Sequence, residues 1–168
     1  MKIRFLSVSL CSALLVAGCG KKDAPATGAP AASAPAATAP AAAAPRVIEV
    51  TGNDTMQFSV TALSAKVGED LKIVFTNIGS APKEAMGHNF VLLKPGSDTM
   101  AFGAASAVAK DTDHIPPALK DQVIAHTAIL GPRKSEELLI KGLAAGEYPY
   151  LCSFPGHFVM MKGVLSVK

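Results

Sequence analysis

Short segments in which apolar and polar residues alternate recur from residue 46 to the C-terminus, with turn-forming residues between them. Such alternation is typical of strands that bury one face, and clusters of Gly, Asn, Asp and Pro predict the turns. We expect eight strands, at residues 46–50, 56–60, 71–77, 88–93, 123–130, 135–141, 147–152 and 162–168. Short strands at this spacing predict an all-β sandwich or barrel.

One segment, from Ser97 to Asp121, departs from this pattern. Its first half is rich in alanine, and Ser97 or Asp98 is a suitable N-cap for a helix. We expect the helix to end at the sequence IPP, which contains Pro116 and Pro117, because proline cannot continue a helix. The segment is therefore predicted to form one short helical flap outside the sheets.

The N-terminus reads as an export signal rather than as part of the domain. Lys2 and Arg4 precede an apolar run that is too short to span a membrane. The run ends in LVAGC, which resembles a bacterial lipoprotein signal and implies that residues 1–18 are removed and that Cys19 receives a lipid. The alternative is an ordinary signal peptide with an incidental cysteine near the cleavage site.

Residues 19–45 are predicted to be the lipidated N-terminus and an extended linker. Proline recurs every five residues from Pro25 to Pro45 within an alanine-rich tract. Alanine favours helix, but proline at this spacing removes a donor from nearly every turn, so a continuous helix cannot form. We expect a tether of polyproline character, followed by one domain over residues 46–168.

Charge excludes one class of partner. The whole chain has a formal net charge of +3, but residues 46–168 contain 12 Lys and Arg against 12 Asp and Glu, so the domain is formally neutral. A neutral domain without a basic stripe argues against binding to nucleic acid.

The candidate chemistry lies in the segment YPYLCSFPGHFVMMKGVLSVK, which contains Cys152, His157 and Met161. Cys152 is the single cysteine after Cys19, so no second cysteine of the domain can pair with it. His88, in EAMGHNFVLL, is the fourth candidate ligand. Two imidazoles, a thiolate and a thioether are the ligand set of a blue-copper site, in which the thioether is a weak axial donor.

Four motifs in the same order resemble azurin, a member of the cupredoxin family: TGNDTMQFS, MGHNFVLL, VIAHTAILG and CSFPGHFVMMKGVLSVK. With the lipoprotein signal, the resemblance is to lipid-modified azurins. It implies a cupredoxin-like Greek-key β-sandwich over residues 46–168. It further implies that His88, Cys152 and His157 are trigonal ligands of one copper ion, cycling between Cu(I) and Cu(II), and that Met161 is the axial ligand.

The same resemblance assigns roles around the metal. The Gly87 carbonyl would be a distant second axial contact, and the backbone amides of Asn89 and Phe154 would donate to the Cys152 sulfur. The Asn89 side chain would tie the two ligand segments together. Met86 and Phe158 would belong to an exposed apolar patch at which partners dock.

The function implied is one-electron transfer rather than enzymatic catalysis. No acid, base or open coordination position is evident for a substrate. The expected partners are c-type cytochromes and a periplasmic reductase or peroxidase. The protein is expected to be a monomer, tethered by its lipid to the bacterial outer membrane, with the domain in the periplasm or at the cell surface.

Two other readings remain open at this stage. A copper-handling protein would bind the ion and pass it on, although such proteins tend to have flexible or Met- and His-rich exposed sites. A thiol enzyme would use Cys152 with a histidine as nucleophile and base, but Met161 then has no role.

Other positions carry weaker expectations. His126 is expected to face outward from a strand, and His114 to be solvated in the flap. Azurins usually contain a disulfide that this domain cannot form, and some have a buried histidine near position 77, where this chain has Asn77. We therefore expect no pH switch at that position.

Overall fold

The computed structural model describes residues 44–168. The predicted signal peptide, the lipidation site at Cys19 and the predicted linker up to residue 43 lie outside the described residues. Eight strands are present in the described part: β1 (Arg46–Gly52), β2 (Ala62–Ala65), β3 (Leu71–Asn77), β4 (Val91–Leu93), β5 (Val123–His126), β6 (Ser135–Ile140), β7 (Gly146–Leu151) and β8 (Lys162–Val167). The helical elements are α1 (Lys83–Met86), α2 (Thr99–Ser106) and the 3-10 turns η1 (Lys110–Thr112), η2 (Pro117–Gln122) and η3 (His157–Val159).

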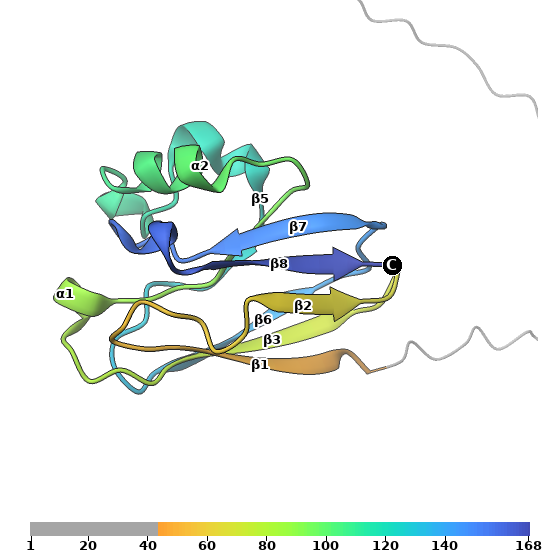
Figure 1. The fold of residues 1–168 in the computed structure, drawn as a ribbon, viewed down its shortest axis with the longest axis horizontal. Helices are drawn as coiled ribbons and strands as arrows, with labels where there is room; N and C mark the ends of the chain where they lie inside the picture. Colours follow the sequence, from red (N-terminus) through yellow and green to blue (C-terminus); the bar gives the residue numbers. More distant parts are fainter. Residues whose placement is uncertain (1–43) are drawn as a thin grey trace, which may run out of the picture. The chain divides into compact units, whose positions relative to one another are not determined.

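The strands form two sheets that stack as layers (Figure 1). One sheet has the order β1-β3-β6 and the other the order β2-β8-β7-β4-β5. The pairs β1–β3 and β2–β8 are parallel, and the remaining neighbours are antiparallel. This arrangement matches the cupredoxin β-sandwich, so the predicted fold class is confirmed.

Alternation along the strands fills the space between the sheets. In β3, every second side chain is buried, including Leu71, Ile73 and Phe75. Four aromatic rings meet in the core with centroid separations between 4.7 and 6.5 Å, namely those of Phe58, Phe75, Phe90 and Tyr150. Aromatic packing at these separations adds to the stabilisation from buried area.

Residues 56–60 were predicted as a strand, and that prediction is wrong. The Asn53 side-chain oxygen accepts hydrogen bonds from the backbone amides of Thr55 and Gln57, which forms a tight turn. Met56 has a positive φ of 56°, and Phe58 forms only an isolated bridge to Gly52. The edge strand instead comes later, as β2.

The flap forms as expected at its start but not at its end. Asp98 is the N-cap of α2, and its carboxylate accepts from the amides of Met100 and Ala101. The helix ends at Ser106, well before Pro116, and Pro117 instead begins η2. The prolines therefore do not end α2.

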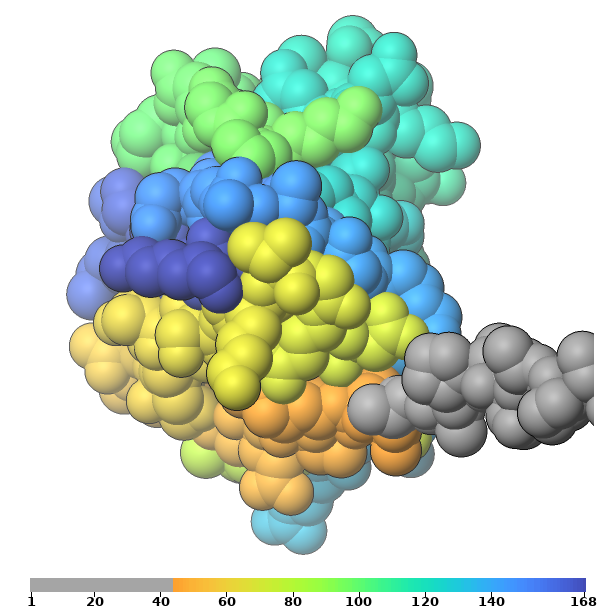
Figure 2. Space-filling model, turned by 90° about the vertical axis from the view of Figure 1, so that its right-hand side faces the viewer, coloured from red at the N-terminus to blue at the C-terminus, as the bar shows by residue number. Residues whose placement is uncertain are grey.

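The flap covers one side of the five-stranded sheet through a second apolar cluster. Figure 2 shows it as a ridge beside β7. Phe102 of α2 is fully buried and packs among side chains from the sheet and the flap, namely Val91, Leu93, Ile115 and Leu151. No helix between residues 44 and 168 is long and apolar enough to cross a membrane.

Candidate metal centre

Three buried side chains from two separate segments bring their donor atoms together at one end of the sandwich. The Cys152 sulfur lies 3.9 Å from His88 Nδ1 and 3.7 Å from His157 Nδ1. The two Nδ1 atoms lie 3.1 Å apart. All three residues are at most 4 % exposed. Within the described region, these three side chains form a group that could hold a metal ion.

The local fold explains this convergence. His88 lies between α1 and β4, where its amide donates to the Leu130 carbonyl and its own carbonyl accepts from the Leu130 amide. Cys152 follows β7, and its amide donates to the Met161 carbonyl. The turn between Cys152 and His157 contains Gly156, whose φ of 83° lies in the left-handed region that favours glycine. The backbone therefore fixes the ligand positions.

The separations fit a trigonal metal ion. Metal–nitrogen and metal–sulfur bonds of about 2.0 and 2.3 Å, at roughly 120°, place nitrogens about 3.5 Å apart and nitrogen and sulfur about 3.7 Å apart. The observed separations of 3.1, 3.7 and 3.9 Å are close to these values. Two imidazoles and one thiolate in this arrangement are typical of a blue-copper centre.

Burial sets the protonation states of the metal-free site. It raises the pKa of the Cys152 thiol to about 12, although hydrogen bonds from the Asn89 and Phe154 amides partly offset it. It lowers the pKa of His157 to about 4, with help from the neighbouring His88. It also lowers the pKa of His88, against the opposing effects of the Asn53 carbonyl and the Asp54 carboxylate. The imidazoles are thus neutral and ready to bind, whereas the thiol must release a proton to a metal.

The second ring nitrogen of His88, Nε2, faces a backbone carbonyl. Nε2 is buried and has no hydrogen-bond partner among residues 44–168. The Asn53 carbonyl nevertheless faces the ring closely enough to favour its protonated form. A metal on Nδ1 would place the ring proton on Nε2, where this carbonyl is the available acceptor.

Met161 is fully buried beside the cluster. Its amide donates to the His157 carbonyl at 2.7 Å, which joins it to the ligand loop. Gly52 leaves the space that Met161 occupies, because a Cβ on Gly52 would stand 2.6 Å from the Met161 methyl and 3.4 Å from His88 Cγ. The Met161 methyl and the His88 ring therefore both border Gly52, and a side chain at this position would crowd them.

Gly87 is also constrained by its surroundings. It is buried, and a Cβ there would collide with the Ile129 side chain and the Lys83 carbonyl. Glycine lets the backbone before His88 approach the neighbouring loop. This is where a carbonyl contact to the metal was predicted.

Asn89 and Ser153 join the two ligand segments. Asn89 Nδ2 donates to Ser153 Oγ, and the Ser153 amide donates to Asn89 Oδ1, each at 2.8 Å. Phe154 places its ring 4.7 Å from the ring of His157, centroid to centroid. The Asn89 side chain thus joins the two segments, and the Phe154 ring packs beside that of His157.

The exposed apolar surface near the ligands differs from the expected patch. Met86 is only partly exposed, and Phe158 packs partly buried against Gly103 and the flap cluster. Val159 and Met160 are 53 % and 57 % exposed. Phe158 is therefore less of a surface residue than predicted, and the tip of the loop is formed by the two residues after it.

The structure adds Asp54 and Asn77 to the surroundings of the site and corrects the prediction for His114. Asp54 accepts from the amide and hydroxyl of Ser80, and buried Asn77 bonds to the Leu130 carbonyl and the Gly79 amide, so both brace the loop before α1. His114 was expected to be solvated, but it is 9 % exposed and bonds through Nδ1 to the Ser106 carbonyl. His126 is exposed on β5, as expected.

A mixed-strand β-sandwich with a buried His-Cys-His cluster defines this chain as a cupredoxin. The family model for copper binding proteins of the plastocyanin/azurin family matches residues 45–168. The chain belongs to this family, and its site takes one copper ion and serves one-electron transfer.

The similar proteins and the solved structure described next are azurins. The chain is similar to azurin from Pseudomonas denitrificans, with 37 % identity over 72 % of this chain and 97 % of the relative. It is also similar to azurin from Pseudomonas fluorescens biotype A, with 38 % identity over 72 % of this chain and 97 % of the relative. Among solved structures, azurin iso-2 of Methylomonas sp. strain J has 34 % identity and a TM-score of 0.65, covering 74 % of this chain and 99 % of that one.

Proposed function

We propose that this protein is a tethered one-electron carrier. Its copper ion would be bound by His88, Cys152 and His157, with the Met161 thioether as a weak axial ligand and the Gly87 carbonyl as a distant contact. The observation that carries the proposal is the convergence of three buried donor atoms at 3.1 to 3.9 Å from two segments 64 residues apart.

Electron transfer is the chemistry that this ligand set serves. A thiolate and a thioether favour Cu(I), and imidazoles suit both oxidation states. The protein backbone holds the ligands, so the site would rearrange little when an electron moves. Burial of all three donors also argues against rapid release of the ion, which a copper-handling protein would need.

The hydrogen bonds at the sulfur contribute to tuning. The amides of Asn89 and Phe154 donate to Cys152 and withdraw charge from the thiolate, which stabilises the reduced state. These residues act on the copper through the Cys152 sulfur.

The proposed surroundings follow from the sequence. Cys19 would carry the lipid that anchors the chain to the outer membrane, and residues 19–45 would hold the domain in the periplasm or at the cell surface. Electron exchange with a c-type cytochrome, a reductase or a peroxidase would occur at the end near His157, where Val159 and Met160 are exposed. The protein would act as a monomer and would not bind nucleic acid.

The copper proposal is tested by adding Cu(II) to the purified full chain. We expect an intense blue band that bleaches with ascorbate and returns on reoxidation, with one copper bound per chain. His157→Ala should lose the intense band, whereas His126→Ala should retain it because His126 is exposed on β5. A colourless complex in the unaltered protein would refute the blue-copper assignment.

The anchor is tested separately. Cells expressing the full chain are labelled with a radioactive fatty acid and fractionated. We expect label and membrane association in the unaltered protein and neither in Cys19→Ser. Equal fractionation of the two proteins would refute the lipid anchor without affecting the copper site.

A further inference from the structure

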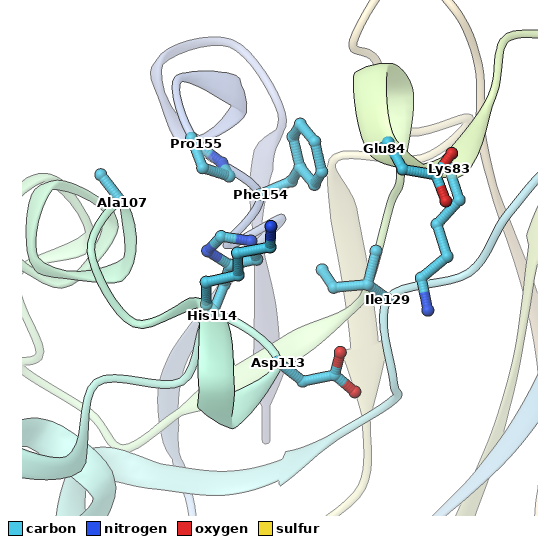
Figure 3. A pocket seen from close by; sticks show the side chains of 9 residues that line it. Lys83, Glu84, Ala107, Asp113, His114, Ile129, Phe154 and Pro155 are labelled. Atoms are coloured by element: carbon cyan, nitrogen blue, oxygen red, sulfur yellow. The ribbon is translucent and has the colours of Figure 1, made fainter.

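A cleft of about 470 Å³ lies beside the metal-binding loop (Figure 3). Its size is within the range typical of small-molecule sites. It is lined from three directions: α1, the flap and the loop that carries Cys152 and His157. The lining residues are Lys83, Glu84, Ala107, Lys110, Asp113, His114, Ile129, Phe154 and Pro155.

The lining combines apolar walls with balanced charge. Ile129, Phe154 and Pro155 present apolar surface, and Figure 3 shows the Ile129 side chain close to the Phe154 ring. The charged residues are two lysines and two acids, Lys83, Lys110, Glu84 and Asp113. Formal neutrality favours an uncharged ligand with apolar faces over an ion.

His114 supplies one polar atom of defined character. Its Nδ1 lies 2.8 Å from the Ser106 carbonyl oxygen, which can only accept a hydrogen bond, so Nδ1 carries the proton of the neutral ring. Nε2 is then a hydrogen-bond acceptor. No protein group bonds to it among residues 44–168, and His114 lines the cleft. The ring is held in place because the residue is 9 % exposed.

The cleft is in direct contact with the metal site through Phe154. The Phe154 ring lies 5.5 Å from the His114 ring and 4.7 Å from the His157 ring, centroid to centroid. The Phe154 amide also bonds to the Cys152 sulfur. A molecule seated against the Phe154 ring is therefore separated from His157 by that one side chain.

We propose that this cleft binds a small uncharged phenol of the hydroquinone type and delivers its electron to the copper site. This inference rests on the proposed function, because the oxidant is Cu(II). The phenol would release its proton to His114 Nε2 and its electron, by way of Phe154, to the oxidised copper that His88, Cys152 and His157 would hold and that would thereby be reduced. A neutral phenoxyl-type radical leaves, and His114 returns its proton to water.

The test measures bleaching of the blue band of the copper-loaded full chain by hydroquinone in stopped flow. We expect the rate to saturate with hydroquinone concentration, because the phenol binds before it reacts. We also expect the reaction to be slower in D₂O, because the proton moves with the electron. Ferrocyanide, which donates an electron and no proton, should show neither property.

His114→Asn is the informative variant. Asparagine tolerates the left-handed backbone of position 114, at φ 60°, and its amide nitrogen can still donate to Ser106. It removes the acceptor at Nε2. Because a positioned base contributes roughly 10²-fold or more to proton transfer, we expect the hydroquinone rate to fall at least about 10-fold. The ferrocyanide rate should stay unchanged.

Two further variants control for the fold. Ala107→Phe fills the cleft from the exposed end of α2 and leaves the His114 side chain itself unaltered, and it should abolish saturation. His126→Asn makes the same exchange at an exposed histidine and should react like the unaltered protein. If His114→Asn does not fold, Ala107→Phe still decides the question.

Binding is measured independently of the reaction in the Cu(I) protein, which cannot oxidise the phenol. Hydroquinone should shift the NMR signals of His114, Ile129 and Phe154, and Ala107→Phe should abolish these shifts. The inference is overturned by a strictly linear rate without an isotope effect, by an unchanged rate in His114→Asn, or by shifts confined to other faces. If the protein does not turn blue with Cu(II), the proposed function itself has failed.

Discussion

Asn89 and Ser153 exchange two hydrogen bonds of 2.8 Å across the interior, and this pair connects the segment before β4 to the segment after β7. Both side chains are fully buried. Each is the immediate neighbour of a ligand, His88 in one case and Cys152 in the other. The pair therefore holds the two halves of the metal site at a fixed separation with or without a metal ion.

Replacing Asn89 with Ala should destabilise the copper-free protein. The change leaves the Ser153 amide buried without a partner, which costs about 1–3 kcal/mol. Urea unfolding of the copper-free protein measures this loss. We also expect a shifted absorption band in the copper-loaded variant, because the ligand segments are no longer tied.

Ser135→Ala is the matched control for this prediction. Ser135 exchanges a hydrogen bond with Thr76 at 2.8 Å, but on an exposed part of the sheet. Its loss should change the free energy of unfolding by less than about 0.5 kcal/mol. Equal effects of the two variants would contradict the bracing role of Asn89.

Gly52→Ala should disturb the site from the opposite side. The added methyl would stand 2.6 Å from the Met161 methyl and 3.2 Å from the Phe75 ring. Overpacking of this kind costs about 1–3 kcal/mol, and displacement of Met161 should alter the electron paramagnetic resonance spectrum of the Cu(II) protein.

Gly146→Ala is the control for the glycine change. A Cβ there meets Pro95 and Tyr148 at ordinary contact distances of 3.4 Å, in β7 and away from the ligands. Its spectrum should match that of the unaltered protein. A normal spectrum for Gly52→Ala as well would show that Met161 is not held by this gap.

The sequence predicts the fold well wherever alternation and core burial coincide. The strand at 71–77 was predicted with the observed boundaries because Leu71, Ile73 and Phe75 recur at every second position. The strand at 56–60 was not, because the Asn53 side chain organises a turn whose chemistry overrides the local apolar pattern. The short strand β2 has only weak alternation and owes its place to parallel pairing with β8.

The ligand cluster was predictable for a different reason. Cys152 and His157 lie on one short loop, and their residue types already limit the metal. The gap at Gly52 and the position of His114 depend on contacts between segments far apart in the chain, as between Gly52 and Met161 or His114 and Phe154. No local pattern reports such contacts, so only the fold reveals them.

Met161 substitutions should tune the copper site without abolishing it. Met161→Gln replaces a soft sulfur with a harder oxygen, which stabilises Cu(II), so the reduction potential should fall. Met161→Leu removes the donor and keeps the site apolar, so the potential should rise. Protein-film voltammetry measures both changes, and both variants should remain coloured because His88, Cys152 and His157 are intact. Shifts of the same sign in the two variants would contradict an axial role.

Removing copper should make the stability of the protein sensitive to mild acid. In the unfolded chain, histidine binds a proton near pH 6.5. Burial lowers the folded-state pKa of His157 to about 4, and also lowers that of His88. Below pH 6.5 the unfolded state therefore binds more protons, so the free energy of unfolding falls between about pH 6.5 and pH 4 and is level above that range.

Urea unfolding of the copper-free protein at pH 7.5, 6.0 and 5.0 measures this dependence, because these values lie above the range in which the carboxylates titrate. The acids Asp54, Glu69 and Asp70 have lowered pKa values owing to their hydrogen bonds, so their contribution is lost only at lower pH. His157→Gln should reduce the slope, and His126→Gln should not. A copper-free protein whose stability is the same at pH 7.5 and pH 5.0 would contradict the assignment of two buried neutral imidazoles.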